Sequence, residues 1–371
     1  MTDYPTDPRL ADGRWLRIPG PTPVPPAVLQ AMTMPMVPHR GPEMIDLVRA
    51  LRGKLQEVHR TDGEVLVWSG SGSAGWEAAI QNCLRPGDHV VVTVCGSFGE
   101  RFAAVSERLG LRVTRVAVPW GEPVTAEQVA EAMSAHLDVR AVLVTHNETS
   151  TGVTNPLREI AEVARAGGAL VIVDAVSSAA AMPLETDAWG LDWVISGSQK
   201  AWMCPPGLML AAVSDRAMQA AARDGGFHRS FWDAETMARG WETGQLPTTP
   251  SIPLLRALEV ALDMMLDEGV ERMWARQAEL GRYLRSALTD LGLRTYARPG
   301  YESASITAVR PPAGLRASEL QRRIREDSGI EVATGQKPHA EEVIRIGTMG
   351  WTGRPELDAT VESIARVVGA K

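Results

Sequence analysis

One lysine follows a short apolar strand in a stretch that carries few charges. Residues 194–207 read VISGSQKAWMCPPG, and Lys200 comes directly after the small residues that break the apolar run. The prolines at 205 and 206 forbid a long helix, so we expect Lys200 at a strand end on a short, rigid loop. A desolvated amine loses its proton more easily than in water, as an amine that attacks a carbonyl must. A surface lysine is the alternative interpretation of this stretch taken alone.

A loop of glycines and serines after the strand at 65–68 has the composition of a phosphate site. This Gly/Ser loop reads SGSGSAG over residues 69–75, and a helix is expected from about residue 76. Small residues let backbone N–H groups approach an anion, and the helix N-terminus adds partial positive charge. The loop lacks the lysine of a P-loop, and its glycines miss the dinucleotide spacing. A flexible turn is the alternative.

Three further strand ends carry an aromatic ring, a hydroxyl-rich loop and a carboxylate. Phe98 follows the strand at 89–94, and residues 147–152 after the strand at 140–145 read NETSTG. Phe98 is placed to lie over a group that the Gly/Ser loop holds, although a core aromatic would fit the same pattern. Asp174 ends a fully apolar strand, where a carboxylate needs a partner or must take up a proton. An aspartate that caps a helix or turn is the alternative for Asp174.

The elements that must position these residues alternate between strands and helices. Near-continuous apolar strands separated by amphipathic helices predict an α/β fold, a mostly parallel sheet covered by helices on both faces in three layers. The expected strands are 65–68, 89–94, 111–118, 140–145, 169–173, 193–196 and 208–213. Ligands of such sheets bind at the carboxyl ends of the strands.

The set of groups expected at these strand ends matches the requirements of pyridoxal 5′-phosphate. Lys200 would form the Schiff base, and Asp174 would pair with the pyridinium nitrogen and keep it protonated. The Gly/Ser loop would hold the phosphate, and Phe98 would stack on the ring.

The pattern changes after about residue 250. Two long helices are expected at 254–266 and 270–291, followed by strands near 303–309 and 343–347 and by helices at 317–327 and 354–369. We therefore expect an N-terminal arm (1–16), a large cofactor-binding α/β domain (17–255) and a smaller C-terminal α+β domain (256–371).

Composition excludes several classes of function. The 371 residues are 44% hydrophobic and 22% charged, and the net charge of -7 argues against nucleic acid as a partner. Three cysteines without metal-ligand spacing suggest neither disulfides nor a metal site. The N-terminus is polar and acidic, unlike a signal peptide, and no apolar run is long enough to span a membrane, so a cytoplasmic protein is expected.

The sequence resembles the class V, fold type I pyridoxal-phosphate aminotransferases, in particular the alanine–glyoxylate and serine–pyruvate (serine–glyoxylate) branch. The matching segments run in order over nearly the whole chain. They are PGPTPVP (19–25), SGSGS (69–73), EAA (77–79), PGD (86–88), Gly99 after the aromatic, THNETSTG (145–152), VDAVSS (173–178), SGSQK (196–200), PPG (205–207) and IRIG (344–347). The combination of SGSQK with PPG is highly specific.

The resemblance implies a role for each residue in catalysis. Lys200 would also shuttle a proton between the substrate Cα and the cofactor, opposite the pyridinium partner Asp174. Val176 would pack beside the ring, Phe98 would take the stacking position, and Thr149 would reach the ring hydroxyl side.

The resemblance also implies which residues hold the phosphate and the substrate. The phosphate would be held by Ser71, Gly72, Ser73 and Gln199. Thr249 would reach the phosphate of the neighbouring subunit, which implies a homodimer with shared sites. Arg345 would clamp the substrate α-carboxylate, where a planar guanidinium outperforms a lysine. Two departures affect substrate choice or phosphate affinity: Ser73 stands where some relatives carry histidine, and Leu246 where some have tyrosine.

The implied reaction is ping-pong transamination between a small L-amino acid, alanine or serine, and a 2-oxo acid, glyoxylate or pyruvate. One alternative is another amine donor such as 2-aminoethylphosphonate. A lyase or cysteine desulfurase is a second, although Phe98 occupies the stacking place and Cys204 is fixed before two prolines. A cofactor-free interaction protein on the same fold is a third, and the joint presence of Lys200, Asp174 and Arg345 argues against it.

Overall fold

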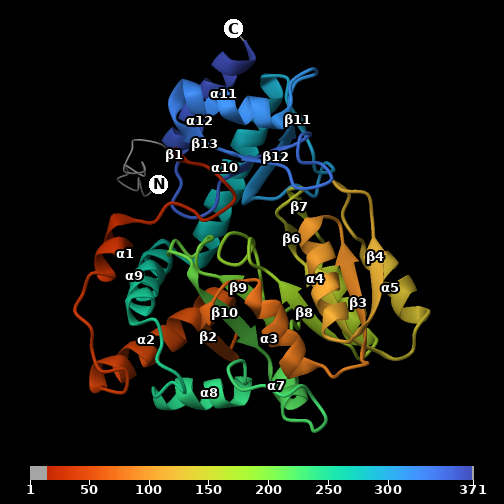
Figure 1. The fold of residues 1–371 in the computed structure, drawn as a ribbon, viewed down its shortest axis with the longest axis vertical. Coiled ribbons are helices and arrows are strands. Elements are labelled where there is room, and N and C mark those ends of the chain that lie inside the picture. Colours follow the sequence, from red (N-terminus) through yellow and green to blue (C-terminus); the bar gives the residue numbers. More distant parts are fainter. Residues whose placement is uncertain (1–14, 370–371) are drawn as a thin grey trace.

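The computed structural model describes residues 15–369 of the chain. Most of the expected N-terminal arm, residues 1–14, lies outside the described residues. The last two residues of this arm, Trp15–Leu16, form strand β1, which pairs in parallel with β13 (Ile330–Glu331). The chain leaving β1 therefore starts on the smaller, upper part of the molecule and runs down into the larger part (Figure 1).

A seven-stranded sheet forms the centre of the larger part. In spatial order its strands are β2 (Glu64–Gly70), β10 (Gly207–Val213), β9 (Trp193–Gly197), β8 (Leu170–Asp174), β5 (Val139–Thr145), β3 (His89–Val94) and β4 (Arg112–Ala117). β10 is antiparallel to both of its neighbours, and the other pairs are parallel. The expected mostly parallel sheet is confirmed.

Helices cover this sheet on both faces, as three layers require (Figure 1). They are α2 (Pro42–His59), α3 (Ala74–Cys83), α4 (Ser97–Arg108), α5 (Ala126–Ser134), α6 (Leu157–Ala166), α7 (Asp215–Ala221), α8 (Ala234–Thr243) and α9 (Ile252–Glu268), with the short α1 (Pro26–Ala31) before them. In α6 the buried residues are Leu157, Ile160, Ala161 and Ala164, the spacing of a helix with one apolar face. A short two-stranded ribbon, β6 (Asn147–Glu148) and β7 (Val153–Thr154), projects beyond β5.

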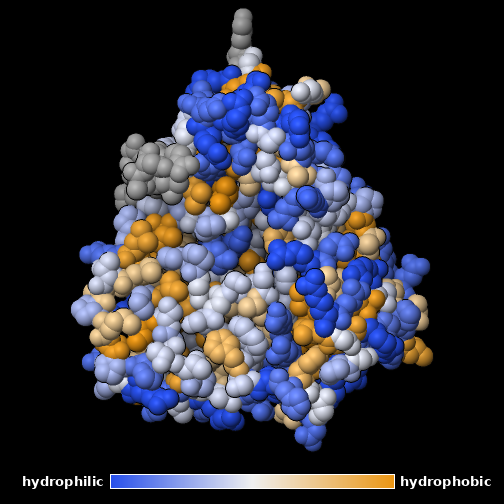
Figure 2. Space-filling view, viewed as in Figure 1, coloured by the Kyte–Doolittle hydropathy of each residue, from blue (hydrophilic) through white to orange (hydrophobic). Residues whose placement is uncertain are grey.

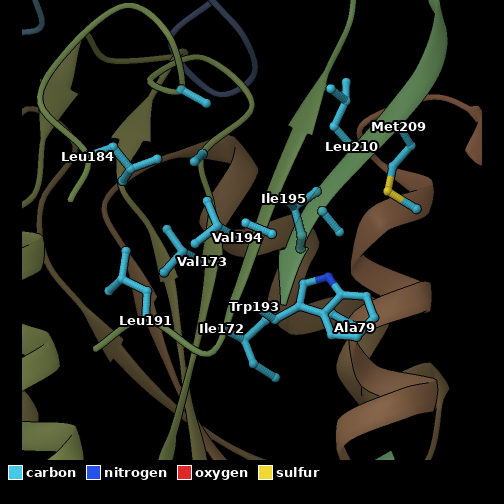
Figure 3. Packing of buried hydrophobic residues seen from close by; sticks show 14 of the residues in the cluster. Ala79, Ile172, Val173, Leu184, Leu191, Trp193, Val194, Ile195, Met209 and Leu210 are labelled. Carbon is cyan, nitrogen blue, oxygen red and sulfur yellow. The ribbon is translucent and has the colours of Figure 1, made fainter. Parts of the chain in front are cut away.

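The core lies between the sheet and these helices. Side chains alternate along β9, so Trp193 and Ile195 point toward α3 and Met209, whereas Val194 points to the opposite side with Val173 (Figure 3). All five are fully buried or nearly so. Burying an aliphatic side chain of this size contributes about 1.5–3 kcal/mol, so these residues stabilise the contact between the sheet and its helices.

The smaller part contains an antiparallel sheet with three helices. Its strands are β11 (Arg294–Thr295), β12 (Ile306–Arg310), β15 (Ile344–Gly347) and β14 (Ala333–Thr334), and its helices are α10 (Val270–Asp290), α11 (Ala317–Ser328) and α12 (Arg354–Val368). It has an apolar core of its own, which includes Leu284, Leu320 and Ile346. The division into domains at residues 255 and 256 stays a prediction. The helix α9 crosses that position, and its Leu258 and Leu262 pack in the core of the larger part.

Within residues 15–369, no helix combines the length and the apolar character that crossing a membrane requires.

Candidate active site

A cavity of about 130 Å³ opens at the carboxyl edge of the central sheet. Its walls come from the ends of β2, β3, β5, β8 and β9 and from the loops after them. The lining residues are Ser71, Gly72, Ser73, Trp76, Phe98, Asn147, Thr149, Asp174, Val176, Ser177, Gln199 and Lys200. Nine of these are residues that the sequence singled out, so the structure brings them together. Trp76, Asn147 and Ser177 were not expected there.

The Lys200 loop is held in place by hydrogen bonds across its base. The Ser198 hydroxyl donates to the Pro205 carbonyl at 2.7 Å and accepts from the Leu208 N–H at 3.1 Å. Lys200 is partly buried, and its ammonium group donates to the Pro19 carbonyl. Burial, with a smaller effect of the Arg345 charge, lowers the pKa of Lys200 to about 8, although Asp174 opposes the change. The loop therefore presents an amine that is easily deprotonated.

An N-terminal strap, residues 17–22, lies against this loop. The Thr22 hydroxyl donates to the Lys200 carbonyl at 2.9 Å, and the Thr22 N–H donates to the Gln199 carbonyl at 3.0 Å. Gly20 has φ +116°, and a Cβ built on it would lie 2.6 Å from Lys200 Nζ. A glycine is therefore needed where the strap passes the lysine.

The strap also contacts the smaller part of the molecule. The Arg17 carbonyl accepts from Gly347 N–H at 2.8 Å, and Arg17 Nη1 donates to Thr352 Oγ1 at 2.8 Å. Because Gly347 ends β15, the strap joins the strand that carries Arg345 to the loop that carries Lys200.

Asp174 is buried at the end of β8 with one donor on each carboxylate oxygen. The Val176 N–H donates to Oδ1 at 3.0 Å, and Trp76 Nε1 donates to Oδ2 at 3.0 Å. Burial raises the pKa of Asp174 to about 6, and these two donors act against the rise. The carboxylate is therefore more easily protonated than an exposed aspartate, although it is mostly ionised at neutral pH.

The Gly/Ser loop and Gln199 leave polar groups available on the opposite wall. Ser73 precedes α3, and its side chain makes no capping hydrogen bond. Gln199 Oε1 is buried and has no hydrogen-bond partner within residues 15–369. A Cβ on Gly72 would lie 2.6 Å from Val176 Cγ2. The Gly/Ser loop can therefore approach Val176 this closely only because residue 72 is glycine. A buried polar group without a partner is costly, and an anion at the α3 N-terminus would provide one.

Phe98 is fixed at the start of α4 by the buried carboxylate of Glu148, which was not expected at this site. Glu148 Oε2 accepts from the N–H groups of Phe98 and Gly99, each at 3.0 Å. The other oxygen accepts from the Ser150 N–H at 3.0 Å and from its hydroxyl at 2.6 Å. Glu148 thus occupies the N-terminus of α4, where the helix dipole favours a negative charge.

Arg345 lies beside the cavity without lining it. Its Nε donates to the Thr334 carbonyl at 2.8 Å and its Nη1 to the Thr149 carbonyl at 3.4 Å. Burial lowers the pKa of Arg345 to about 10, and Glu148 opposes the change. No carboxylate within residues 15–369 forms a hydrogen bond or ion pair with it, so its charge is available to a ligand.

Thr249 and Leu246 stand apart from this cavity. Thr249 is exposed in the loop between α8 and α9 and does not contact the cavity of its own chain, whereas Leu246 is buried. The expected contact of Thr249 with a neighbouring subunit stays a prediction.

The arrangement fits pyridoxal 5′-phosphate in each of its parts. An amine of lowered pKa faces a buried carboxylate across a cavity flanked by an aromatic ring, and polar groups without partners lie beside a helix N-terminus. The fold and the site together define a pyridoxal-phosphate-dependent enzyme of fold type I.

Comparison with known proteins identifies the family. The model of the family described as aminotransferase class-V matches residues 14–352, and the chain belongs to this family. It is 36% identical to an L-aspartate–glyoxylate aminotransferase of Paracoccus denitrificans, over 90% of this chain and 85% of that protein. It is 34% identical to a serine–glyoxylate aminotransferase of Methylorubrum extorquens, over 90% and 86%. The structure of an alanine–glyoxylate aminotransferase from Nostoc sp. superposes with a TM-score of 0.92 at 33% identity, covering 96% of this chain and 95% of that one.

The family, the fold class, the cofactor and the aminotransferase activity expected from the sequence are therefore confirmed. The individual roles of the site residues stay predictions.

Proposed function

We propose that this protein transfers the amino group of a small L-amino acid, alanine or serine, to glyoxylate or pyruvate. The relatives named above act on glyoxylate, and a similar structure is that of a pyridoxamine–pyruvate aminotransferase from Mesorhizobium loti. The observation that carries the proposal is Arg345, a cation that forms no ion pair within residues 15–369 and donates to the Thr149 carbonyl at 3.4 Å on the cavity wall. A single guanidinium at this place suits a substrate with one α-carboxylate.

Each residue around the cavity would contact a different part of the bound cofactor. When bound, pyridoxal phosphate supplies a reactive carbonyl carbon and a ring that accepts electrons from a breaking Cα–H bond. Ser71, Gly72, Ser73 and Gln199 would hold its phosphate with the α3 N-terminus. Asp174 would hold the proton on the ring nitrogen, Phe98 would stack on the ring, and Val176 would pack beside it.

Lys200 would bind the cofactor covalently and then move the proton. Its lowered pKa leaves part of the amine neutral near physiological pH, so Nζ can take the proton from the substrate Cα and return it on the cofactor side. The Pro19 carbonyl gives the protonated amine an acceptor when it is released. Thr149 Oγ1, which donates to Ser177 Oγ at 2.9 Å, would face the ring hydroxyl side.

Arg345 would orient each substrate. Its Nε donates to the Thr334 carbonyl and one N–H of Nη1 to the Thr149 carbonyl, which leaves one N–H of Nη1 and both of Nη2 to form two parallel hydrogen bonds to a carboxylate. Fixing the carboxylate fixes the direction of the Cα–H bond, and orientation of this kind is a large part of the reduction in barrier.

A homodimer is part of the same proposal. Thr249 is exposed, and the segment around α1 exposes Leu29, Met34 and Met36, with 48%, 56% and 67% of their surfaces accessible. Figure 2 shows apolar residues gathered on the side of the molecule where α1 lies. Such a surface supports a contact with a second copy, through which Thr249 would reach the neighbouring phosphate. The cytoplasmic location and the absence of a nucleic acid partner stay predictions from composition.

A screen of half-reactions tests the substrate class. The lysine-bound form of the enzyme is mixed with alanine, serine, glycine, aspartate or 2-aminoethylphosphonate, and the aminated form with glyoxylate or pyruvate, while the cofactor absorbance is followed. Alanine or serine should react fastest, and Arg345→Ala should slow them strongly. A faster reaction of 2-aminoethylphosphonate that is insensitive to Arg345→Ala would favour the alternative donor. Release of sulfide from cysteine would favour the desulfurase alternative.

A further inference from the structure

Trp76 is the side chain that contacts Asp174 most directly. It lies in the first turn of α3, is 2% exposed and lines the same cavity. Its Nε1 donates to Asp174 Oδ2 at 3.0 Å, while the backbone N–H of Val176 serves Oδ1 at the same distance. Any L-residue except proline at position 176 offers that backbone donor, so the indole is the donor that depends on residue type.

Two residues of α4, Phe102 and Arg101, pack against the indole. The Phe102 ring stacks on it with centroids 5.4 Å apart and planes at 17°. The Arg101 guanidinium lies 5.4 Å from the Trp76 ring centroid and 5.5 Å from that of Phe98. One cation thus bridges the ring that supports Asp174 and the ring expected to stack on the cofactor, which holds the direction of the indole N–H.

The surroundings of Asp174 make that donor important. Besides burial, the Glu148 charge raises the pKa of Asp174, and only the Lys200 charge and the two hydrogen bonds oppose it. His146, whose N–H donates to the Asp174 carbonyl, is itself buried with its pKa lowered to about 4, so it is neutral at pH 7. The Lys200 charge is not constant, because its nitrogen titrates once it binds the cofactor covalently. The two N–H donors are present whatever the charge of Lys200.

We propose that Trp76 is a positioning residue for Asp174: its indole N–H keeps the carboxylate anionic and turned toward the cavity, so that the ring nitrogen of the bound cofactor holds the proton they share. Without that donor the carboxylate becomes the stronger base and takes the proton. The ring nitrogen then becomes neutral, and the ring accepts electrons less well. The inference rests on the proposed role of Asp174 and adds a residue to it.

A matched pair of substitutions tests this role. Trp76→Phe keeps an aromatic ring between Phe102 and Arg101 and removes the N–H. Trp241→Phe is the control, because Trp241 is fully buried in α8 and its Nε1 has no hydrogen-bond partner within residues 15–369. Two quantities are measured besides turnover: the affinity of the apo-protein for pyridoxal phosphate, and the pH midpoint of the visible absorbance change of the loaded protein.

Loss of a hydrogen bond to a charged group should weaken cofactor binding by roughly tenfold to a hundredfold in Trp76→Phe. A neutral ring makes the nitrogen bonded to Lys200 more basic, so the absorbance midpoint should rise by roughly one pH unit. Trp241→Phe should change neither quantity. If Trp76→Phe has the affinity and midpoint of Trp241→Phe, the inference is wrong.

Asp174→Asn separates this inference from the proposed function. If Asp174→Asn leaves affinity and midpoint at the wild-type values, the role of Asp174 itself is wrong. If Asp174→Asn changes the affinity and the midpoint while Trp76→Phe keeps the wild-type values, only the proposed role of Trp76 is wrong. Should Trp76→Phe fail to fold, 3-benzothienylalanine at position 76 keeps the indole shape with sulfur in place of N–H and gives the same readout.

Discussion

The apo-protein should react with pyridoxal phosphate near neutral pH because the pKa of the Lys200 amine is lower than that of an exposed lysine. The fall of its pKa from 10.5 to about 8 has burial as its first cause, then the Arg345 charge, with Asp174 opposing. It corresponds to roughly 3 kcal/mol against the ammonium form. At pH 7.5 about a quarter of the amine is then neutral, against about one part in a thousand for an exposed lysine, an advantage of roughly 200-fold in reactive amine.

Two substitutions separate the charges from burial because they act in opposite directions. Arg345→Gln removes a nearby cation, so the pKa of Lys200 should rise. Asp174→Asn removes a nearby anion, so it should fall. Arg158→Gln, on the exposed surface of α6, is the control and should change nothing.

The assay is the rate at which the visible absorbance of the lysine-bound cofactor appears, measured from pH 6 to 11. Division by the rate with Nα-acetyl-lysine, expressed per neutral amine at each pH, removes the titration of the aldehyde itself. Because the neutral amine is the reactive form, the rate should rise with pH and level off above a midpoint near 8. A wild-type midpoint within about half a unit of 10.5, or shifts of the same sign in both variants, would refute the reasoning.

The remaining predictions concern the substrate clamp, the phosphate wall and acid stability. Arg345→Lys keeps the charge but loses the two-pronged geometry, so steady-state kinetics should show KM for alanine rising roughly tenfold to a hundredfold with a smaller change in kcat; an unchanged KM would contradict the clamp. Gly72→Ala places a Cβ 2.6 Å from Val176 Cγ2 and should weaken cofactor affinity, whereas Gly53→Ala in α2 meets nothing within 4 Å and should not. Burial lowers the pKa of His59 to about 4, so the unfolded chain binds a proton below pH 6.5 that the folded chain rejects. The free energy of unfolding should therefore fall by up to roughly 3 kcal/mol from this residue as pH drops from 6.5 to 4, and denaturant titrations at pH 7 and 5 should show a smaller fall in His59→Phe.

The parts of the site that follow strand ends could be predicted from the sequence. Apolar runs of β-branched residues end where a polar residue appears, and parallel strands bring those ends to one edge of the sheet. This is why Ser71, Phe98, Asp174 and Lys200 were expected together and line one cavity.

The parts that depend on long-range contacts could not be predicted in this way. Trp76 donates to a residue 98 positions away, and a tryptophan with helical spacing looks the same in sequence whether its N–H is used or not. The Pro19 carbonyl meets Lys200 from 181 positions away through the backbone, which leaves no mark in residue type. Glu148 lies in the loop 147–152, which was expected to act through its hydroxyl groups and not through a carboxylate. The two consecutive N–H donors that bind Glu148, those of Phe98 and Gly99, can be recognised only once α4 is placed beside this loop.

The strap gives the two parts of the molecule a mechanical link at the reactive amine. At one end Arg17 bonds to Gly347 and Thr352, and at the other end Thr22 bonds to the backbone of Gln199 and Lys200. A displacement of β15 relative to the central sheet would therefore be transmitted to the backbone of Lys200 through this short run of hydrogen bonds.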